Sequence, residues 1–163
     1  MRRSIALILL TIVTAAGCTS SHAPNPSKAS ASTPVTTKNC PSSITPRTLP
    51  TWARSGFHPP TMPMPYVMGD RGDIVAILWA DPPYAPPLAT VNNKILWVAK
   101  TTSGTFTPLQ IRATLGATGQ TVTRQVAGGP GPSIINLPAA GCWSLSLSWS
   151  GHQDHLALRY ASS

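Results

Sequence analysis

The sequence CWSLSLSWS, at residues 142–150, alternates serine with large apolar residues. Successive side chains of a β-strand point to opposite faces, so this pattern predicts a strand with one face in a core and the other in water. The apolar face carries Trp143, Leu145, Leu147 and Trp149. Alternation resumes at residues 156–160 after the turn sequence SGHQD, which predicts a C-terminal hairpin.

Five more short runs have the composition of strands, with clusters of Gly, Pro, Asn or Ser at their ends. They are residues 73–80, 94–99, 109–115, 121–127 and 134–137. The sequence shows no sustained helical repeat. Short strands at this spacing predict an all-β fold, a small antiparallel β-sandwich.

The chain begins with MRR, continues with an apolar run at residues 5–13, and reaches small residues just before Cys18. Basic, apolar and small-residue regions in this order are typical of a secretory signal. The apolar run is much shorter than the roughly 20 residues that a membrane-spanning helix needs. We therefore predict that residues 1–17 are a cleaved signal peptide.

The sequence VTAAGC, which ends at Cys18, resembles the bacterial lipobox, in which the cysteine after a small residue receives lipid and becomes the new N-terminus. Ala15 stands where leucine is more usual. The alternative is ordinary signal cleavage, which would leave Cys18 as a free thiol. Two or three acyl chains hold a protein stably at a bilayer. Acylation of Cys18 would therefore place the protein at the cell membrane, anchored by lipid on the extracytoplasmic face.

The chain has three cysteines, and acylation of Cys18 leaves Cys40 and Cys142 as a pair in an oxidising compartment. We expect a disulfide between them, with two unpaired thiols as the alternative. A loop of about 100 residues would be closed, which is worth ~4 to 5 kcal/mol in the chain-entropy estimate. Cys142 shares the parity of the serines, so its sulfur should leave the sheet on the polar side or at its end. The segment around Cys40 would then be strapped across that exterior.

Residues 18–39 contain almost nothing large and apolar to bury, and we expect a disordered, flexible linker there. The folded β-sandwich domain is expected at residues 40–163. Its first part, residues 40–65, is rich in Pro, Thr and Ser, with Trp52 and Phe57 as its large apolar anchors. This part should be irregular or edge structure packed on a sheet.

The formal net charge is +8, and removal of the predicted signal peptide with its two arginines leaves +6. The remaining basic residues are scattered. A basic run with interleaved aromatic residues, which nucleic-acid binding requires, is absent from the sequence. The charge instead favours attraction to anionic lipid or cell-wall polymer.

Four stretches of sequence, RGDIVAILWADP, NNKILWV, GGPGPSIINLPAAGCW and LSWSGHQDHLALRY, resemble those of a family of uncharacterised lipoproteins from actinobacteria. The resemblance covers most of residues 52–160. It implies an Ig-like β-sandwich on the cell surface. It implies no activity and supplies no catalytic residues.

All four acidic residues are aspartates. Hydrolases that use paired carboxylates need an acid and a base facing one substrate, and this supply is thin. Ser150, His152, Asp154 and His155 have the residue types of a nucleophilic site, but neighbouring positions in a hairpin loop seldom converge as a triad. A Zn or Cu site at His152 and His155 would have two nitrogen ligands. We predict that the protein is not an enzyme.

A cluster of soft ligands within eleven residues comprises His58, Met62, Met64 and Met68. Thioether and imidazole groups suit Cu(I), and a Pro-rich loop could hold them outside the core. The alternative is that the methionines fill an irregular end of the core, since Met is an adaptable filler, and that the protein has no cofactor.

Tyr84, within DPPYAPP, is the aromatic residue that we expect to be most exposed, which makes loop 81–93 a candidate contact surface. Trp143 and Trp149 are better explained by core packing. The sequence thus predicts a non-catalytic binding or structural module of the cell envelope, with an envelope protein or glycan as partner. The alternative function is a copper-binding carrier that uses loop 58–68.

Overall fold

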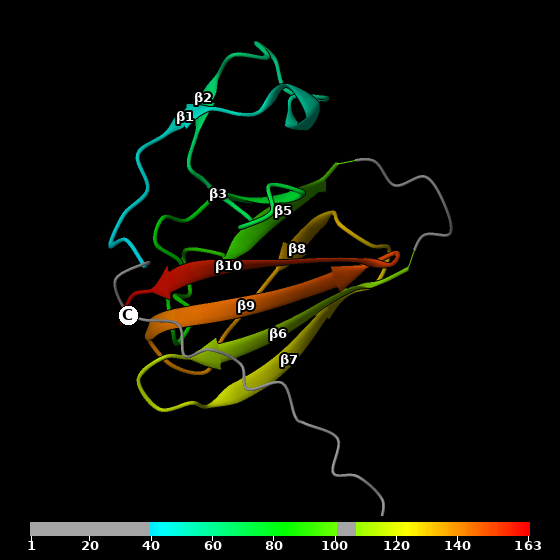
Figure 1. The fold of residues 1–163 in the computed structure, drawn as a ribbon. Coiled ribbons are helices and arrows are strands. Elements are labelled where there is room, and N and C mark those ends of the chain that lie inside the picture. The colour runs from blue at the N-terminus through cyan, green and yellow to red at the C-terminus, as the bar shows by residue number, and fades with distance from the viewer. Residues whose placement is uncertain (1–39, 101–106) are drawn as a thin grey trace, which may run out of the picture. The chain divides into compact units, whose positions relative to one another are not determined.

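The computed structural model describes residues 40–100 and 107–163. The predicted signal peptide, Cys18 and the predicted linker at residues 18–39 lie outside this part of the chain. Two four-stranded antiparallel sheets pack face to face, as Figure 1 shows. The predicted antiparallel β-sandwich is therefore confirmed.

The first sheet has the strand order β10-β9-β6-β7. Its strands are β6 (Leu109–Leu115), β7 (Thr121–Val126), β9 (Gly141–Trp149) and β10 (His152–Tyr160). Every second residue of β9 is buried, and the serines between them are half-buried on the outer face. The alternation in the sequence thus corresponds to one covered face and one face toward water.

The second sheet has the order β3-β4-β5-β8. Its strands are β3 (Tyr66–Met68), β4 (Ile74–Leu78), β5 (Lys94–Ala99) and β8 (Pro132–Ile134). All five residues of β4 are buried, which explains its uninterrupted apolar sequence IVAIL. A strand has a continuous apolar sequence of this kind when both faces of its sheet are covered.

The order of the strands is that of an immunoglobulin-like sandwich. The chain passes from β5 in one sheet to β6 in the other, returns at β8 and crosses again at β9. Strands β4, β5 and β8 take the places of the A, B and E strands, and β10, β9 and β6 those of G, F and C. The strand β3 is added beside the A position. The expectation of an Ig-like sandwich is confirmed by this connectivity.

The main core lies between the sheets and includes Trp97, Trp143, Trp149 and Tyr160, all nearly inaccessible. A second, smaller core lies on the outer face of the second sheet, where Val75 and Ile77 of β4 are buried.

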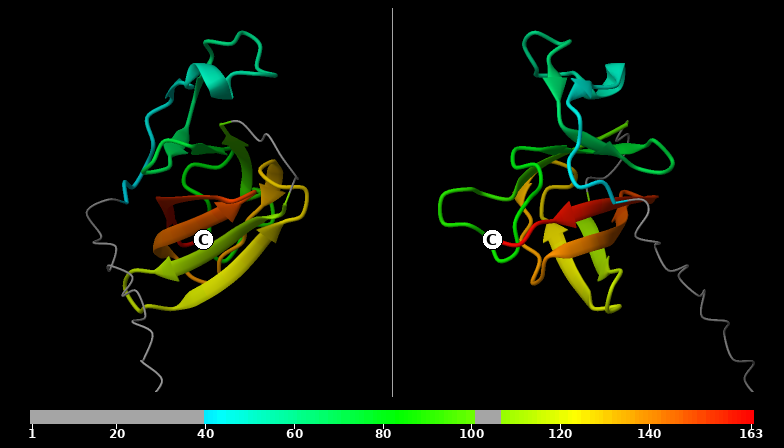
Figure 2. Two further views of the ribbon diagram at one scale, coloured as in Figure 1. Left: turned by 45° about the vertical axis from the view of Figure 1, so that its right-hand side comes forward. Right: turned by 90° about the vertical axis from the view of Figure 1, so that its left-hand side faces the viewer.

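The second core is covered by the segment 47–64, which we call the cap. It consists of β1 (Arg47–Thr48), the 3-10 turn η2 (Thr51–Ala53) and β2 (Pro63–Met64), joined by irregular chain. Leu49 and Ala53 are buried in this core, with Trp52 and Phe57 packed at its margin. Figures 1 and 2 show the cap above β3, on the side away from the first sheet. Irregular structure packed on a sheet is what the composition of residues 40–65 predicts.

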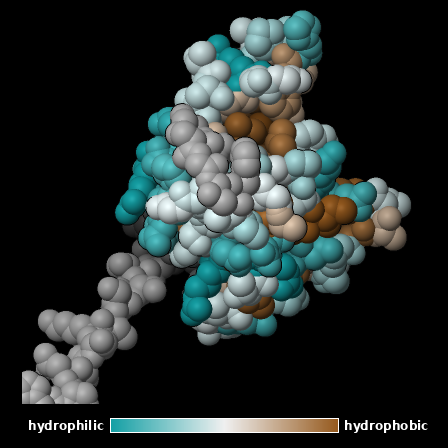
Figure 3. Space-filling model, turned by 90° about the vertical axis from the view of Figure 1, so that its right-hand side faces the viewer, coloured by the Kyte–Doolittle hydropathy of each residue, from teal (hydrophilic) through white to brown (hydrophobic). Residues whose placement is uncertain are grey.

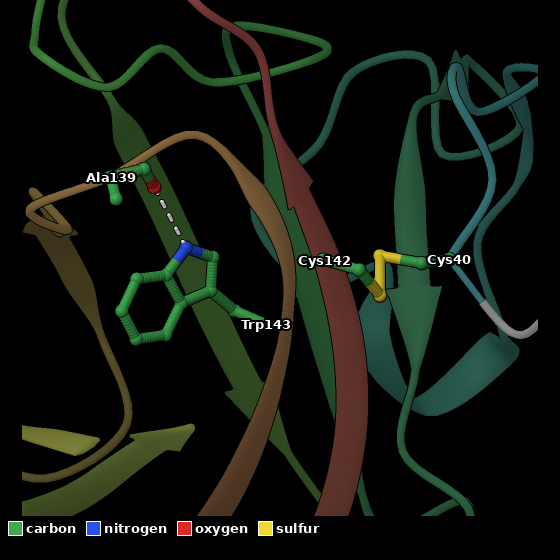
Figure 4. The surroundings of a disulfide bond; sticks show 4 residues. All are labelled: Cys40, Ala139, Cys142 and Trp143. Carbon is green, nitrogen blue, oxygen red and sulfur yellow. Dashed lines mark hydrogen bonds between the residues drawn. A yellow bond between two sulfur atoms is a disulfide. The ribbon is translucent and has the colours of Figure 1, made fainter. Parts of the chain in front are cut away.

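A disulfide joins Cys40 to Cys142 at the start of β9, with a Cα–Cα distance of 5.7 Å. Figure 4 shows the side chains of Cys142 and Trp143 leaving β9 in opposite directions, the indole toward the core and the sulfur away from it. The disulfide therefore lies on the exterior of the sandwich, as the parity of Cys142 predicts. Residues 40–46, which we call the strap, continue from it toward the cap, and the Ile44 N–H donates to Asp81 Oδ2 at 2.7 Å.

Most predicted strands agree with the observed ones to within one or two residues at each end, and the two largest differences lie in the last hairpin and at β8. The last hairpin has a two-residue turn at Ser150 and Gly151, both with positive φ, so the remainder of the expected turn SGHQD belongs to β10. Positive φ at both central residues matches the right-handed twist of a hairpin. The predicted strand at 134–137 is misplaced, because β8 covers Pro132–Ile134 and shares only Ile134 with it, while Ile135 and Leu137 pack in the main core beyond the end of the strand.

Candidate functional site

A groove of about 410 Å³ lies along the strap, in the size range of small-molecule sites. One wall is formed by strap residues and Arg47, and the other by the whole of β3. Successive residues of a strand point to opposite faces, so three consecutive residues can line one groove only if it follows the edge of the strand. The groove therefore runs along the edge of β3 that is not paired with β4.

Among the described residues that line the groove, Arg47 carries the one charged side chain. Its guanidinium carbon lies 4.4 Å from the centre of the Tyr66 ring, a cation–π contact that holds the charge beside β3. The Tyr66 hydroxyl in turn donates to the Thr48 carbonyl at 3.4 Å. The groove thus combines a positive charge with the peptide backbone of an edge strand.

A second exposed feature lies on the outer face of the same sheet, at the end of β4. Trp79 is 49% exposed and Ile134 is 56% exposed, and Lys94 stands between them across three adjacent strands. The Lys94 ammonium lies 5.0 Å from the centre of the Trp79 ring. Figure 3 shows hydrophobic residues reaching the surface on one face of the domain, including an area directly below the cap. We call Trp79, Lys94 and Ile134 the exposed row.

The four predicted soft ligands are divided between two environments. Met64 and Met68 pack against the second core, half-buried, where they serve as fillers. Met62 is 36% exposed and His58 is exposed on the loop between η2 and β2. The described residues contain no group of three or more His, Cys, Asp or Glu side chains placed to hold a metal ion.

The polar residues of the predicted C-terminal turn are separated by the strand that contains them. His152 stacks on Trp149 with ring centres 5.6 Å apart, while His155 points to the opposite face because the two positions differ in parity. The structure therefore does not join the two histidines in one metal site. Asp154 is fully buried and does not face a histidine across the turn.

Asp154 has a role that the sequence reasoning missed. Its carboxylate accepts the backbone N–H groups of Arg71 at 2.9 Å and Asp73 at 3.1 Å, and also that of His155. It thereby joins β10 to the turn between β3 and β4. A Cβ at Gly69 would collide with this carboxylate, so the turn needs glycine there. The unbroken alternation of residues 154–160 is the signal that places Asp154 on the inner face.

Loop 79–93 is held by a buried polar residue that was also missed. Asn93 accepts the Tyr84 N–H and donates to the Tyr84 carbonyl, each at 2.8 Å, and it donates to Asn136 at 3.0 Å. Tyr84 is consequently half-buried, and the expectation that it is the most exposed aromatic residue is wrong. Trp79, directly after β4, is the exposed aromatic residue instead.

Comparisons with models of protein families, with curated proteins and with solved structures found no match. The resemblance to an actinobacterial lipoprotein family therefore stays a prediction. Within residues 40–100 and 107–163, no helix has the length and apolar character needed to cross a membrane.

Proposed function

We propose that this protein is a membrane-tethered extracytoplasmic lipoprotein whose β-sandwich is a non-catalytic binding module of the cell envelope. Its acylated Cys18 would insert into the membrane, and the folded domain would meet an envelope protein or glycan. The resemblance of residues 52–160 to actinobacterial lipoproteins agrees with this proposal.

The Cys40–Cys142 disulfide is the observation that carries the proposal. Stable disulfides form mainly in oxidising, extracytoplasmic compartments. The pairing uses two of the three cysteines and leaves Cys18, within a lipobox-like sequence, for the lipid. Export, acylation and disulfide formation are thus three parts of one consistent reading.

A binding role is supported by what the domain leaves accessible. The exposed row places a tryptophan and an isoleucine in water, where neither contributes to a core. The groove adds an unpaired strand edge beside Arg47. A non-catalytic role is supported by the use of carboxylates in structure, since Asp154 holds backbone N–H groups and Asp81 holds the strap.

Copper binding is the less well supported alternative. Met64 and Met68 pack against the second core, whereas His58 and Met62 are exposed on the loop between η2 and β2, so the four soft ligands do not share one environment. A Cu(I) titration with a competing chelator tests this alternative, using a variant in which Met62, Met64 and Met68 are changed to Leu. Tight binding that the variant loses would establish a copper function, and equal weak binding in both proteins would end it.

The proposal is tested by expressing the full chain in a bacterial host fed with an alkyne-bearing fatty acid. We expect label on the wild-type chain in the membrane fraction, and loss of both label and membrane association in Cys18→Ala. Ser20→Ala, in the same segment, is the matched control and should behave as wild type. Label that persists without Cys18, or an unlabelled and soluble wild-type chain, would contradict the lipid anchor.

A further inference from the structure

The hydrogen-bond register of β3 shows where its backbone groups point. Gly69 N–H donates to the Ile74 carbonyl at 2.9 Å, and Leu78 N–H donates to the Pro65 carbonyl at 2.9 Å. In an antiparallel pair, every second residue is hydrogen-bonded to its partner strand. The backbone hydrogen-bonding groups of Pro65, Val67 and Gly69, the odd-numbered residues in and beside β3, therefore point toward β4.

Tyr66 and Met68 occupy the other set of positions, opposite Ile77 and Val75. Their backbone N–H and C=O groups point away from β4, on the side where the groove lies. Met68 is half-buried and Tyr66 is 5% exposed. An edge strand presents N–H and C=O groups that a further chain can pair with, so this edge favours a partner that supplies backbone donors and acceptors.

The charge of the groove restricts the chemistry of that partner. Arg47 forms a cation–π contact with Tyr66 but is not in an ion pair with a described carboxylate, because the described aspartates engage elsewhere or lie outside the groove. A ligand with a carboxylate near Arg47 would gain a charge-assisted hydrogen bond.

We propose that the groove binds an extended acidic peptide, which pairs with the outward backbone groups of Tyr66 and Met68 and places a carboxylate at Arg47. The open part of the edge ends at Asp70, whose N–H donates to the His155 carbonyl of β10 at 2.8 Å. Addition of a strand to an exposed sheet edge is a common mode of peptide recognition, with backbone hydrogen bonds providing affinity and side-chain contacts providing specificity. This inference rests on the proposed binding function and names its partner.

The test uses the purified full chain with Cys18→Ser and an intact Cys40–Cys142 disulfide, against a phage-displayed library of random dodecapeptides. Phage that bind the Met68→Pro variant are removed first. Proline at position 68 eliminates the outward N–H without breaking a hydrogen bond to β4. We expect the enriched peptides to alternate apolar and polar residues and to contain Asp or Glu.

Affinities of an enriched peptide are then measured by fluorescence anisotropy against matched variants. Met68→Pro should weaken binding about tenfold or more, and Met68→Leu, which retains the N–H, should change it less than about twofold. Arg47→Glu should weaken binding about tenfold, since a charge-assisted contact becomes a repulsion. Arg112→Glu, on the outer face of the first sheet, makes the same charge change away from the groove and should have little effect.

Peptides methylated on backbone nitrogens provide a readout that does not depend on any protein variant folding. Methylation at one set of alternate residues should abolish binding, and methylation at the other set should leave it nearly unchanged, because a strand offers every second N–H to its neighbour. Hydrogen exchange at the Met68 amide should slow when the peptide is bound.

The proposal is overturned if no peptide is enriched over Met68→Pro, if both methylated sets bind equally, or if the peptide binds Arg47→Glu as well as wild type. It is also overturned if the Met68 amide becomes protected with increasing protein concentration alone, because a second copy of the chain would then occupy the edge. Fatty-acid labelling is independent of these measurements. If peptide binding failed and labelling remained intact, the proposal of a peptide site in the groove would be refuted, and the proposal of a lipid anchor would stand.

Discussion

The outer face of the first sheet is exposed to water, whereas the outer face of the second sheet is covered by the cap. On the first sheet, the serines of β9 stand between buried residues and face outward. On the second, Val75 and Ile77 of β4 are fully buried beneath the cap. A strand in water on one face needs an alternating sequence, and a strand covered on both faces needs a continuous apolar one. The second sheet therefore depends on the N-terminal segment in a way that the first does not.

Among the contacts that join the two sheets and the segments covering them, three can be tested by substitution of a side chain. The disulfide ties the strap, and through it the cap, to β9. Asp154 of β10 holds the turn between β3 and β4. Tyr160 of β10 reaches across the core, where its hydroxyl donates to the Ile135 carbonyl at 2.7 Å. Breaking each link in turn measures how far the second sheet relies on the first.

Loss of the disulfide should have the largest effect. The two cysteines are separated by 102 residues, and opening a loop of this size should lower the free energy of unfolding by ~4 to 5 kcal/mol. Urea denaturation of the Cys18→Ser chain, with and without replacement of Cys40 and Cys142 by serine, measures the difference. If the pair contributed less than about 1 kcal/mol, the strap would not be an important constraint on the unfolded chain.

An aspartate introduced on the outer face should destabilise the second sheet much more than the first. Val75→Asp would bury a carboxylate under the cap and should lower the free energy of unfolding by ~3 to 5 kcal/mol. Ser146→Asp, on the outer face of β9, should change it by less than about 0.5 kcal/mol. Urea midpoints of the two variants test the comparison, and similar losses in both would show that the cap does not seal the second sheet.

Removal of the Asp154 carboxylate should cost ~2 to 4 kcal/mol, because three N–H groups lose a charged acceptor. Asp70→Asn, an exposed change in the same turn, is the control and should be nearly neutral. Gly69→Ala should also destabilise the native protein through the collision with Asp154. The double variant Gly69→Ala/Asp154→Ala should therefore be less destabilised than the sum of the single variants.

Regular alternation made much of this fold predictable. The predicted strands at 94–99 and 109–115 coincide with β5 and β6. The position of the disulfide on the exterior of the sandwich followed from the parity of Cys142. The short strand β3 was not predicted, because three residues are too few for a periodic signal and its Met68 was interpreted as a metal ligand. Its identity depends on pairing with β4, which is a tertiary property.

The functional features were less predictable for the same reason. Asp154 and Asn93 act through backbone groups that are distant in sequence, so neither belongs to a local motif. Exposure of Trp79 and of Ile134 depends on where the cap ends. The groove requires the strap and β3 to lie side by side, and the sequence indicated the strap alone.

The Tyr160 link should be weaker and dependent on pH. Burial raises the pKa of Tyr160 above its ordinary value of about 10, and the charge of Arg124 opposes this only in part. A raised pKa gives stability that is present below pH ~10 and is lost as the pH rises further, because the unfolded chain then releases the proton first.

Tyr160→Phe should lower the free energy of unfolding by ~1 kcal/mol at neutral pH through loss of the bond to Ile135. Above pH ~10 the wild-type protein should lose up to about 1.4 kcal/mol per pH unit more than the variant. The difference in urea midpoint between the two proteins should therefore shrink between neutral pH and pH ~11. A difference independent of pH would show that Tyr160 ionises in the native protein as readily as in the unfolded chain.

The smallest effect is expected at the exposed row, which belongs to the covered sheet but lies beyond its cover. Trp79→Ser and Ile134→Ser should each change the free energy of unfolding by less than about 0.5 kcal/mol, because neither side chain is buried. Thermal and urea unfolding of both variants provide the measurement. A loss of more than about 1 kcal/mol would assign these residues to stability and weaken the case for a contact surface. Changes in the free energy of unfolding near zero would mean that the apolar residues of the exposed row do not stabilise the fold. This is expected of a surface that another molecule covers.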